Sequence, residues 1–155
     1  MSSEHDFIRQ RLARIERQLQ QGPSDLVYES RSRGRQRSAD DTGMREERLY
    51  KREARLLRHI LAITKEGQVL YALVHWRREL GAHLDAHREQ YRVQQDEYDT
   101  WWALPPYKRQ RFPQPKRPPL AHYTDQNGQD WILDDRFLLL LEDLHSRLSQ
   151  WMSEE

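Results

Sequence analysis

MREERLYKREARLLRHILAITKE, residues 44–66, is the stretch with the clearest helical pattern in the chain. Its apolar residues recur every three or four positions, and such spacing places them along one face of an α-helix. We therefore predict an amphipathic helix here that packs against other helices. This apolar face, called a seam, is formed by Leu49, Leu56, Ile60 and Ile63, and it is widened by Leu57 and Leu61.

Gly67 follows this helix within the sequence Lys-Glu-Gly-Gln, which is typical of a helix end. We therefore expect a turn at Gly67 and an αα-hairpin formed with a second helix over residues 68–102. The start of the second helix, Val69 to Val74, is apolar on all sides, as expected for a buried element. The alternative is a single long helix that continues through Gly67.

The N-terminal segment, residues 1–22, has a narrower seam. Ser3 and Asp6 are spaced as in a capping box at a helix start, and Gly22-Pro23 is a strong stop signal. Because one short seam buries little surface, this helix needs a second helix to pack on, in the same chain or in a partner. Its seam residues, our candidates for protein docking, are Ile8, Leu12, Ile15 and Leu19.

The remaining segments are less regular. Residues 23–43 are rich in Ser, Gly and Arg, which predicts a flexible linker or binding arm. Residues 103–120, called the strap, hold most of the prolines and are expected to be extended rather than helical. Asn127-Gly128 lies between two β-prone runs and predicts a short β-hairpin. A last helix is expected over residues 134–152, which begin with two acids suited to a helix N-terminus.

These elements together predict an all-α fold: a small helical bundle or αα-hairpin with coiled-coil-like seams, the extended strap and one short β-hairpin. We expect three parts, an N-terminal amphipathic helix (1–22), a linker (23–43) and a helical domain (44–155). Only 36% of the residues are hydrophobic and the mean hydropathy is −1.09, so the core is thin for a globular domain. The predicted core residues are Leu56, Ile60, Leu73, Trp76, Leu141, Leu144 and Leu148.

The composition excludes several classes of chemistry. The chain has no cysteine, so it has no disulfide, thiolate metal site or cysteine nucleophile. It also lacks a glycine-rich phosphate loop, a nucleophile elbow and a dinucleotide-binding fingerprint. We therefore expect a protein without cofactor or enzymatic activity. The polar N-terminus and the shortness of the longest apolar run predict a cytoplasmic protein with no membrane association.

One pattern resembles a metal site. Glu79, His83 and His87 are each four residues apart, so on a helix they share a face. However, Leu84 occupies the position of the glutamate in the His-Glu-x-x-His motif, and no fourth ligand is evident. A solvated polar face is the simpler interpretation, and a metal-dependent enzyme is a distant alternative.

The strongest binding candidate is the region of the strap, where aromatic rings alternate with Lys and Arg and no acid lies between Asp99 and Asp125. Cations that contact phosphates and rings that stack on bases are typical of single-stranded nucleic-acid binding. The same pattern fits protein docking, or a structural role in which the rings hold the strap on the helices. The candidate residues for nucleic-acid or partner binding are Arg31, Arg33, Arg35, Arg37, Arg45, Arg48, Arg52, Arg55, Trp101, Trp102, Tyr107, Lys108, Arg109, Arg111, Phe112, Lys116 and Arg117.

Charge is unevenly distributed although the net charge is only +1. Residues 1–124 hold 24 Lys and Arg against 17 Asp and Glu, whereas residues 125–155 hold two against eight. Such asymmetry suits an interaction with another protein, self-association through helix seams, or binding of nucleic acid. Our leading hypothesis is a non-enzymatic protein-interaction or assembly module, such as a small subunit or adaptor. The alternative is a helical protein that binds single-stranded DNA or RNA.

Overall fold

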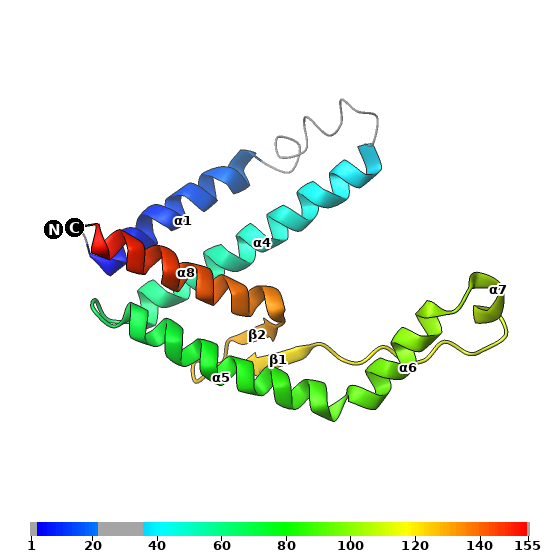
Figure 1. Ribbon diagram of the computed structural model, residues 1–155. Coiled ribbons are helices and arrows are strands. Elements are labelled where there is room, and N and C mark those ends of the chain that lie inside the picture. The colour runs from blue at the N-terminus through cyan, green and yellow to red at the C-terminus, as the bar shows by residue number, and fades with distance from the viewer. Residues whose placement is uncertain (1–2, 22–35, 155) are drawn as a thin grey trace. The chain divides into compact units, whose positions relative to one another are not determined.

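The computed structural model describes residues 3–21 and 36–154. The protein is mostly helical with one two-stranded antiparallel sheet, which confirms the predicted fold class (Figure 1). Within the described residues, no helix has the length and apolar character needed to cross a bilayer. The elements are α1 (Glu4–Gln21), α4 (Gln36–Ile63), α5 (Val69–Gln90), α6 (Arg92–Ala103), α7 (Pro106–Arg109), β1 (Ala121–Thr124), β2 (Asp130–Leu133) and α8 (Asp135–Ser153).

The chain forms two compact units. Unit 1 comprises Met1–Ala72 and Leu144–Glu155, and unit 2 comprises Leu73–Asp143. Residues 44–155, which were expected to form the helical domain, therefore contribute to both units. The long helices α5 and α8 each begin in one unit and end in the other.

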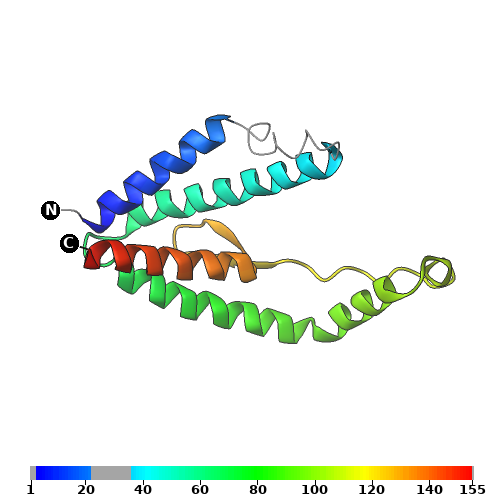
Figure 2. The ribbon, with the colours of Figure 1, turned by 45° about the horizontal axis from the view of Figure 1, so that its top comes forward.

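Unit 1 is built on α1 and α4, which lie side by side (Figures 1 and 2). Ile8 and Ile15 of α1 are buried, as are Leu56 and Ile60 of α4. Burying the apolar seams of two amphipathic helices against each other removes both from water, and this is the main source of stability for such helices. The N-terminal helix therefore finds its packing partner within the same chain.

Polar contacts also join α1 to α4. Arg11 donates two hydrogen bonds to the carboxylate of Glu53, from Nε to Oε1 at 3.0 Å and from Nη2 to Oε2 at 3.2 Å. Glu53 is only 4% exposed, so this two-point contact supplies the charged partner that a buried carboxylate requires. Nearer the surface, Arg58 Nη2 donates to Glu16 Oε1 at 3.0 Å.

Unit 2 encloses a small core between α5, the β-hairpin and the first part of α8. Leu80 and Leu84 of α5 are buried, as are Trp131 of β2 and Phe137 and Leu141 of α8. The rings of Trp131 and Phe137 have centroids 5.9 Å apart. The hairpin thus supplies an aromatic layer to the helices, as expected for a two-stranded sheet that is marginal alone.

The β-hairpin confirms the Asn127-Gly128 signal, although its loop is longer than a two-residue turn. The strands pair with Tyr123 opposite Trp131, and Gly128 has a φ of +81°, which glycine adopts without strain. Asp125 holds the loop together: Oδ1 accepts from the backbone N–H of Asn127 and Gln129, both at 2.9 Å, and Oδ2 accepts from Trp131 Nε1 at 3.0 Å.

Two further local predictions are confirmed. Gly67 has a φ of +86° and lies in the turn between α4 and α5, so the chain does not continue as one helix there. Asp134 caps α8, because its Oδ1 accepts a hydrogen bond from the backbone N–H of Phe137 at 2.8 Å. This bond satisfies one of the amide groups that a helix start leaves without a partner.

Several predicted boundaries are wrong. α4 begins at Gln36, within the stretch expected to be linker, since extending an existing helix by polar residues costs little. The helix expected over residues 68–102 is interrupted at Tyr91 and forms α5 and α6. The strap contains one helical turn, α7, which Pro106 begins at the N1 position, where proline's missing N–H costs nothing.

Among the predicted core residues, Trp76 is the exception, because it is half-buried rather than buried. Leu49 and Ile63 of the predicted α4 seam are also on the surface, with 40% and 45% of their area exposed. The buried stretch of α4 instead centres on Leu56, Leu57 and Ile60. The seam pattern therefore located the correct face of the helix but overestimated the length of the face that is covered.

Candidate binding surface

The strap runs back along α6 in the opposite direction, held by side chains of the helices. Trp101 Nε1 donates to the carbonyl of Phe112 at 3.2 Å, and Gln94 Nε2 donates to the carbonyl of Lys116 at 3.0 Å. Further along, His87 Nε2 donates to the carbonyl of Pro119 at 2.8 Å. Prolines remove backbone donors and prevent the strap from joining a sheet, so its carbonyls are bound by side chains instead.

Arg109 fixes the turn where the chain reverses. Its Nε donates to the carbonyl of Leu104 at 2.9 Å. Its guanidinium lies 5.2 Å from the ring centroid of Trp102 and 5.8 Å from that of Trp101, within the range of a cation–π interaction. The two indole rings are nearly perpendicular, with centroids 5.1 Å apart. Arg109 is therefore a structural part of this turn.

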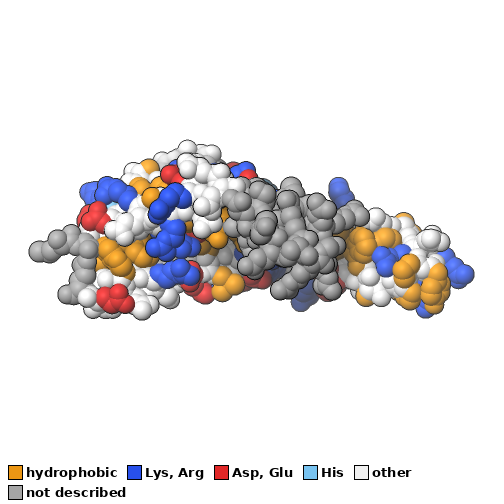
Figure 3. All heavy atoms as spheres, turned by 90° about the horizontal axis from the view of Figure 1, so that it is seen from above, with side chains coloured by type: hydrophobic (Ala, Val, Ile, Leu, Met, Phe, Trp, Pro, Cys, Tyr) orange, Lys and Arg blue, Asp and Glu red, His pale blue; other side chains and the backbone are white. Residues whose placement is uncertain are grey.

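Although the strap is well held, α6 has no buried residue. Apolar side chains remain exposed on α6, α7 and the strap, including Val93 (65%), Trp102 (47%), Tyr107 (62%) and Phe112 (56%). Figure 3 shows hydrophobic and basic side chains gathered together over the α6–α7 region, at the right of the view. An open groove between α6 and the strap is lined by Val93, Asp96, Glu97, Thr100, Trp101, Leu104, Phe112, Pro113 and Pro115.

The charged groups on this surface are not neutralised by one another. Lys108, Arg111, Lys116 and Arg117 are exposed, and none forms an ion pair with another residue in the described part of the chain. Asp96 and Glu97, the α6 acids that line the groove, also form no ion pair within the part of the chain that the structure describes. We call this region, residues 92–117, the α6–strap surface. It combines exposed rings with charges of both signs.

The structure brings together the predicted residues of the strap. The second group of predicted basic residues, the arginines between residues 31 and 55, is not part of this surface. Arg31, Arg33 and Arg35 lie outside the described residues. Arg37 and Arg45 lie in α4, but their side chains are likewise outside the described part. On the same helix Arg48 and Arg55 are exposed and Arg52 is half-buried. The three arginines whose side chains are described, Arg48, Arg52 and Arg55, belong to unit 1, whereas the α6–strap surface belongs to unit 2.

The N-terminal seam is not available as predicted. Ile8 and Ile15 are buried within unit 1, and Leu12 and Leu19 are half-buried. The seam was proposed for protein docking because it had no obvious partner in the sequence, and α4 supplies that partner. A docking role for these four residues would require α1 to separate from α4, which would expose the apolar surface that stabilises both helices.

The three metal-site candidates are engaged elsewhere. Glu79 Oε1 accepts a hydrogen bond from the hydroxyl of Tyr123 at 3.2 Å, and His83 packs on the Tyr123 ring at 4.9 Å. His87 is bonded to the strap. Burial and the neighbouring Glu79 carboxylate raise the pKa of Tyr123, so the phenol stays a hydrogen-bond donor. Across the residues described, no group of three or more potential ligands is placed to hold a metal ion.

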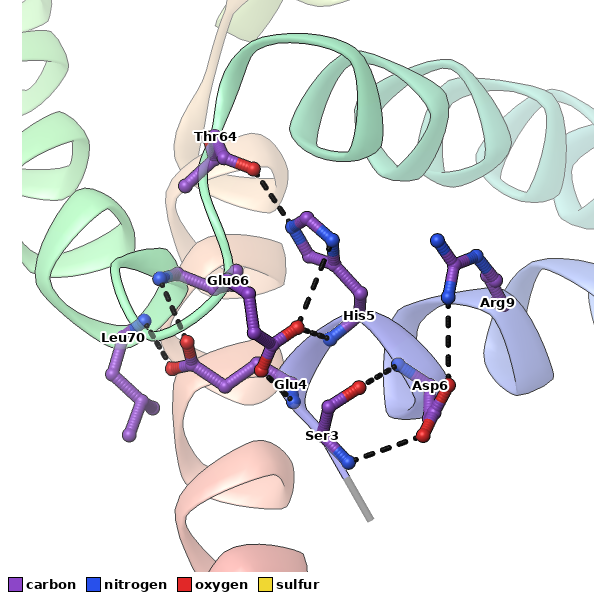
Figure 4. Close-up of polar contacts among 9 residues, drawn as sticks. Ser3, Glu4, His5, Asp6, Arg9, Thr64, Glu66 and Leu70 are labelled. Atoms are coloured by element: carbon purple, nitrogen blue, oxygen red, sulfur yellow. Dashed lines mark hydrogen bonds and ion pairs between the residues drawn. The ribbon is translucent and has the colours of Figure 1, made fainter. Parts of the chain in front are cut away.

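A second polar cluster, which the sequence indicated only in part, joins α1 to the turn before α5 (Figure 4). The predicted capping box is present: Ser3 Oγ accepts from the Asp6 N–H at 3.0 Å, and Asp6 Oδ2 accepts from the Ser3 N–H at 3.2 Å. In addition, the carboxylate of Glu66 accepts from the N–H groups of Glu4 and His5 at 2.7 and 2.9 Å.

Glu4 completes this cluster by capping α5. Its carboxylate accepts from the N–H groups of Val69 and Leu70 at 3.1 and 3.0 Å, and its side chain points into the start of that helix (Figure 4). The N-termini of α1 and α5 are thus each bound by a glutamate that is distant in sequence. Desolvation raises the pKa of Glu66, but the backbone N–H groups of His5 and Glu4 outweigh it and keep that pKa below its usual value. These carboxylates are committed to backbone groups, so the cluster is structural.

No protein-family model, curated protein or solved structure matches this chain.

Proposed function

We propose that this protein is a non-enzymatic protein-interaction module that docks a partner protein through the α6–strap surface. The observation that carries this proposal is that α6 has no buried residue while large apolar side chains beside it are exposed. A helix of 12 residues is marginal on its own, and its stability normally comes from tertiary packing. A partner that covers α6 would supply that packing.

The chemistry of the surface supports the proposal. Exposed Trp102 and Tyr107 are the residue types that contribute most to binding energy at protein interfaces, together with arginine. The hydrogen bonds from Trp101, Gln94 and His87 hold the strap in place before any partner arrives. Such pre-organisation reduces the conformational entropy lost on binding.

The polar groups of the described residues support a role without catalysis. Glu4 and Glu66 cap helices, Glu79 accepts from Tyr123, and His87 holds the strap. A general acid or base needs a perturbed pKa and access to a substrate. Because these groups have structural partners, we infer that the protein acts by binding, and we place that activity in the cytoplasm.

A paired capture experiment tests the proposal. The Trp102→Ala/Tyr107→Ala variant removes two exposed rings from the α6–strap surface. The control Tyr71→Ala/Leu139→Ala removes two large exposed apolar side chains from elsewhere, one aromatic and one aliphatic, where exposure is 70% and 60%. We expect a protein retained by the wild type and the control to be lost from the first variant. The interaction must then be reproduced with the purified partner. Equal binding of that partner to all three proteins would contradict the proposed surface.

Single-stranded nucleic acid is the second candidate partner. It is favoured by one observation: the exposed rings of Trp102, Tyr107 and Phe112 alternate with Lys108 and Arg111, which form no ion pair within the described residues. Anisotropy with labelled RNA and DNA at about 50 and about 200 mM salt tests it, since phosphate contacts make affinity steeply salt-dependent. Binding that weakens in Lys108→Ala/Arg111→Ala would favour this candidate, and no binding at low salt would exclude it.

A further inference from the structure

We propose that the α6–strap surface binds an acidic segment of the partner protein, in which apolar side chains alternate with Asp and Glu. This inference rests on the proposed docking function and assigns the chemical class of the partner. Two properties of the surface support it. One is an excess of cations along the strap, and the other is a groove that is mainly apolar.

The α6–strap surface carries an excess of positive charge. Residues 92–117 contain six Lys and Arg against three Asp and Glu. All three acids lie on α6, whereas the strap, residues 103–120, holds Lys and Arg but no acid. The strap cations that are exposed and form no ion pair within the described part of the chain are Lys108, Arg111, Lys116 and Arg117. An excess of one sign of charge favours a partner of the opposite sign.

Two hydrogen bonds place the strap cations beside α6. The bond from Gln94 Nε2 to the carbonyl of Lys116, 3.0 Å long, holds the backbone of that lysine beside the first half of the helix. The bond from Trp101 Nε1 to the carbonyl of Phe112, 3.2 Å long, holds the neighbouring Arg111 beside the last turn. Cations therefore lie toward both ends of the groove, so a segment bound in the groove gains a cation for its acids at each end.

The groove between α6 and the strap is mainly apolar. Its apolar lining residues are Val93, Trp101, Leu104, Phe112, Pro113 and Pro115. Apolar side chains that cover such a surface remove it from water, and they form the core of most protein interfaces. A purely acidic chain would leave the groove exposed to water. The segment therefore needs apolar side chains between its acids.

Single-stranded nucleic acid fits this surface less well, although it is also anionic. Its phosphates are regularly spaced, so some would lie against Asp96 and Glu97, the exposed acids in the α6 wall of the groove. A protein segment can place an apolar side chain there instead. The ring of Trp102 is also partly occupied, because the guanidinium of Arg109 lies 5.2 Å from its centroid and the ring of Trp101 lies 5.1 Å away. Less of this ring is left for stacking on a base.

Two fluorescein-labelled peptides provide the probes. Each has about 15 residues, long enough to span α6 in a helical or an extended conformation, and carries Leu or Phe at every third or fourth position. The other positions are mainly Glu in one peptide and mainly Lys in the second. Fluorescence anisotropy measures the binding of each peptide, and of labelled single-stranded DNA, to the full chain. We expect the Glu peptide to bind roughly tenfold more tightly than the Lys peptide.

Charge variants locate the binding of the Glu peptide. Lys108→Gln/Arg111→Gln removes two exposed cations of the strap and should weaken binding roughly three- to tenfold. The matched control Arg78→Gln/Arg136→Gln removes the same amount of charge from exposed positions of unit 2 outside residues 92–117. Because salt at about 150 mM screens exposed charges outside the site, the control should change the Kd by less than about twofold. Circular dichroism checks that both variants remain helical.

Removing the acids of α6 should have the opposite effect. Asp96→Asn/Glu97→Gln removes like-charge repulsion toward the Glu peptide, which should therefore bind more tightly than to the wild type. The same variant should bind the Lys peptide more weakly, because the only acids of the groove are gone.

Three results with the wild type would overturn the proposal. They are a Lys peptide that binds as tightly as the Glu peptide, single-stranded DNA that binds more tightly than the Glu peptide, and no binding of the Glu peptide up to about 1 mM. Equal binding of the Glu peptide to the wild type and to Lys108→Gln/Arg111→Gln would overturn it as well.

The docking function is judged separately, with the purified partner of the capture experiment. If the peptide results contradict the proposal but that partner still requires Trp102 and Tyr107, the acidic class of partner is refuted and the docking function stands. If the partner binds equally well without these two rings, the docking surface is refuted, and the inference fails with it.

Discussion

Replacing Glu4 should destabilise unit 1 although this residue lies near the chain terminus. Its carboxylate, only 4% exposed, accepts from the backbone N–H groups of Val69 and Leu70 at the start of α5. Loss of a helix cap costs about 1 kcal/mol, and loss of a negative charge at a helix N-terminus costs up to about 1 kcal/mol more. We therefore expect Glu4→Ala to lower the free energy of unfolding by about 2 kcal/mol.

Thermal unfolding followed by circular dichroism measures this effect. For a chain of this size about 2 kcal/mol corresponds to a fall in Tm of roughly 4–8 °C. Glu4→Gln keeps an acceptor oxygen but loses the charge, so it should cost about half as much. The matched control is Glu16→Gln, which removes one partner of the exposed Arg58 pair and should change stability by less than about 1 kcal/mol. If Glu4→Ala unfolds at the same temperature as Glu16→Gln, the capping role of Glu4 is refuted.

Three other variants test separate parts of the structure. The pKa of Glu66 is lower in the folded state than in the unfolded state. The ionised Glu66 side chain therefore stabilises the fold above the unfolded pKa, and this stabilisation is lost as pH falls through the folded pKa. When Tm is measured from neutral to acidic pH, the Tm of Glu66→Gln should fall less than that of the wild type. Gly128 has a φ of +81° with open space around it, so Gly128→Ala should cost about 1 kcal/mol through backbone strain alone, seen as a lower midpoint in urea. Trp101→Phe removes the donor to the Phe112 carbonyl and should loosen the strap, so trypsin should cleave faster after Arg111 with little change in Tm; an unchanged cleavage rate would show that this bond does not hold the strap.

Local patterns in the sequence located most of the elements, because the groups that decide them are close together in the chain. Gly67 and Gly128 lie where positive φ values are needed, and Asp134 caps the helix that follows it. The periodic apolar residues found the buried faces of α1, α4 and α8. The interruption at Tyr91 has no comparable signal, since neither glycine nor proline marks it.

Contacts between distant residues were beyond sequence reasoning. Arg11 meets Glu53, and Glu4 meets Val69, only because α1 packs within unit 1. For the candidate surface, the sequence identified the rings and cations but could not separate their roles. Arg109 is a structural residue whose side chain is hydrogen-bonded to the carbonyl of Leu104. In contrast, the side chains of Lys108, Arg111, Lys116 and Arg117 are exposed.

We propose that partners cover α6 and the strap rather than the helices of unit 1. Amide hydrogen exchange, followed by mass spectrometry, tests this claim most directly. The full chain is compared alone and with its purified partner. We predict slower exchange in peptides covering residues 92–117 on binding, with α1 and α4 unchanged. Slower exchange confined to α1 and α4, with residues 92–117 unaffected, would contradict the account.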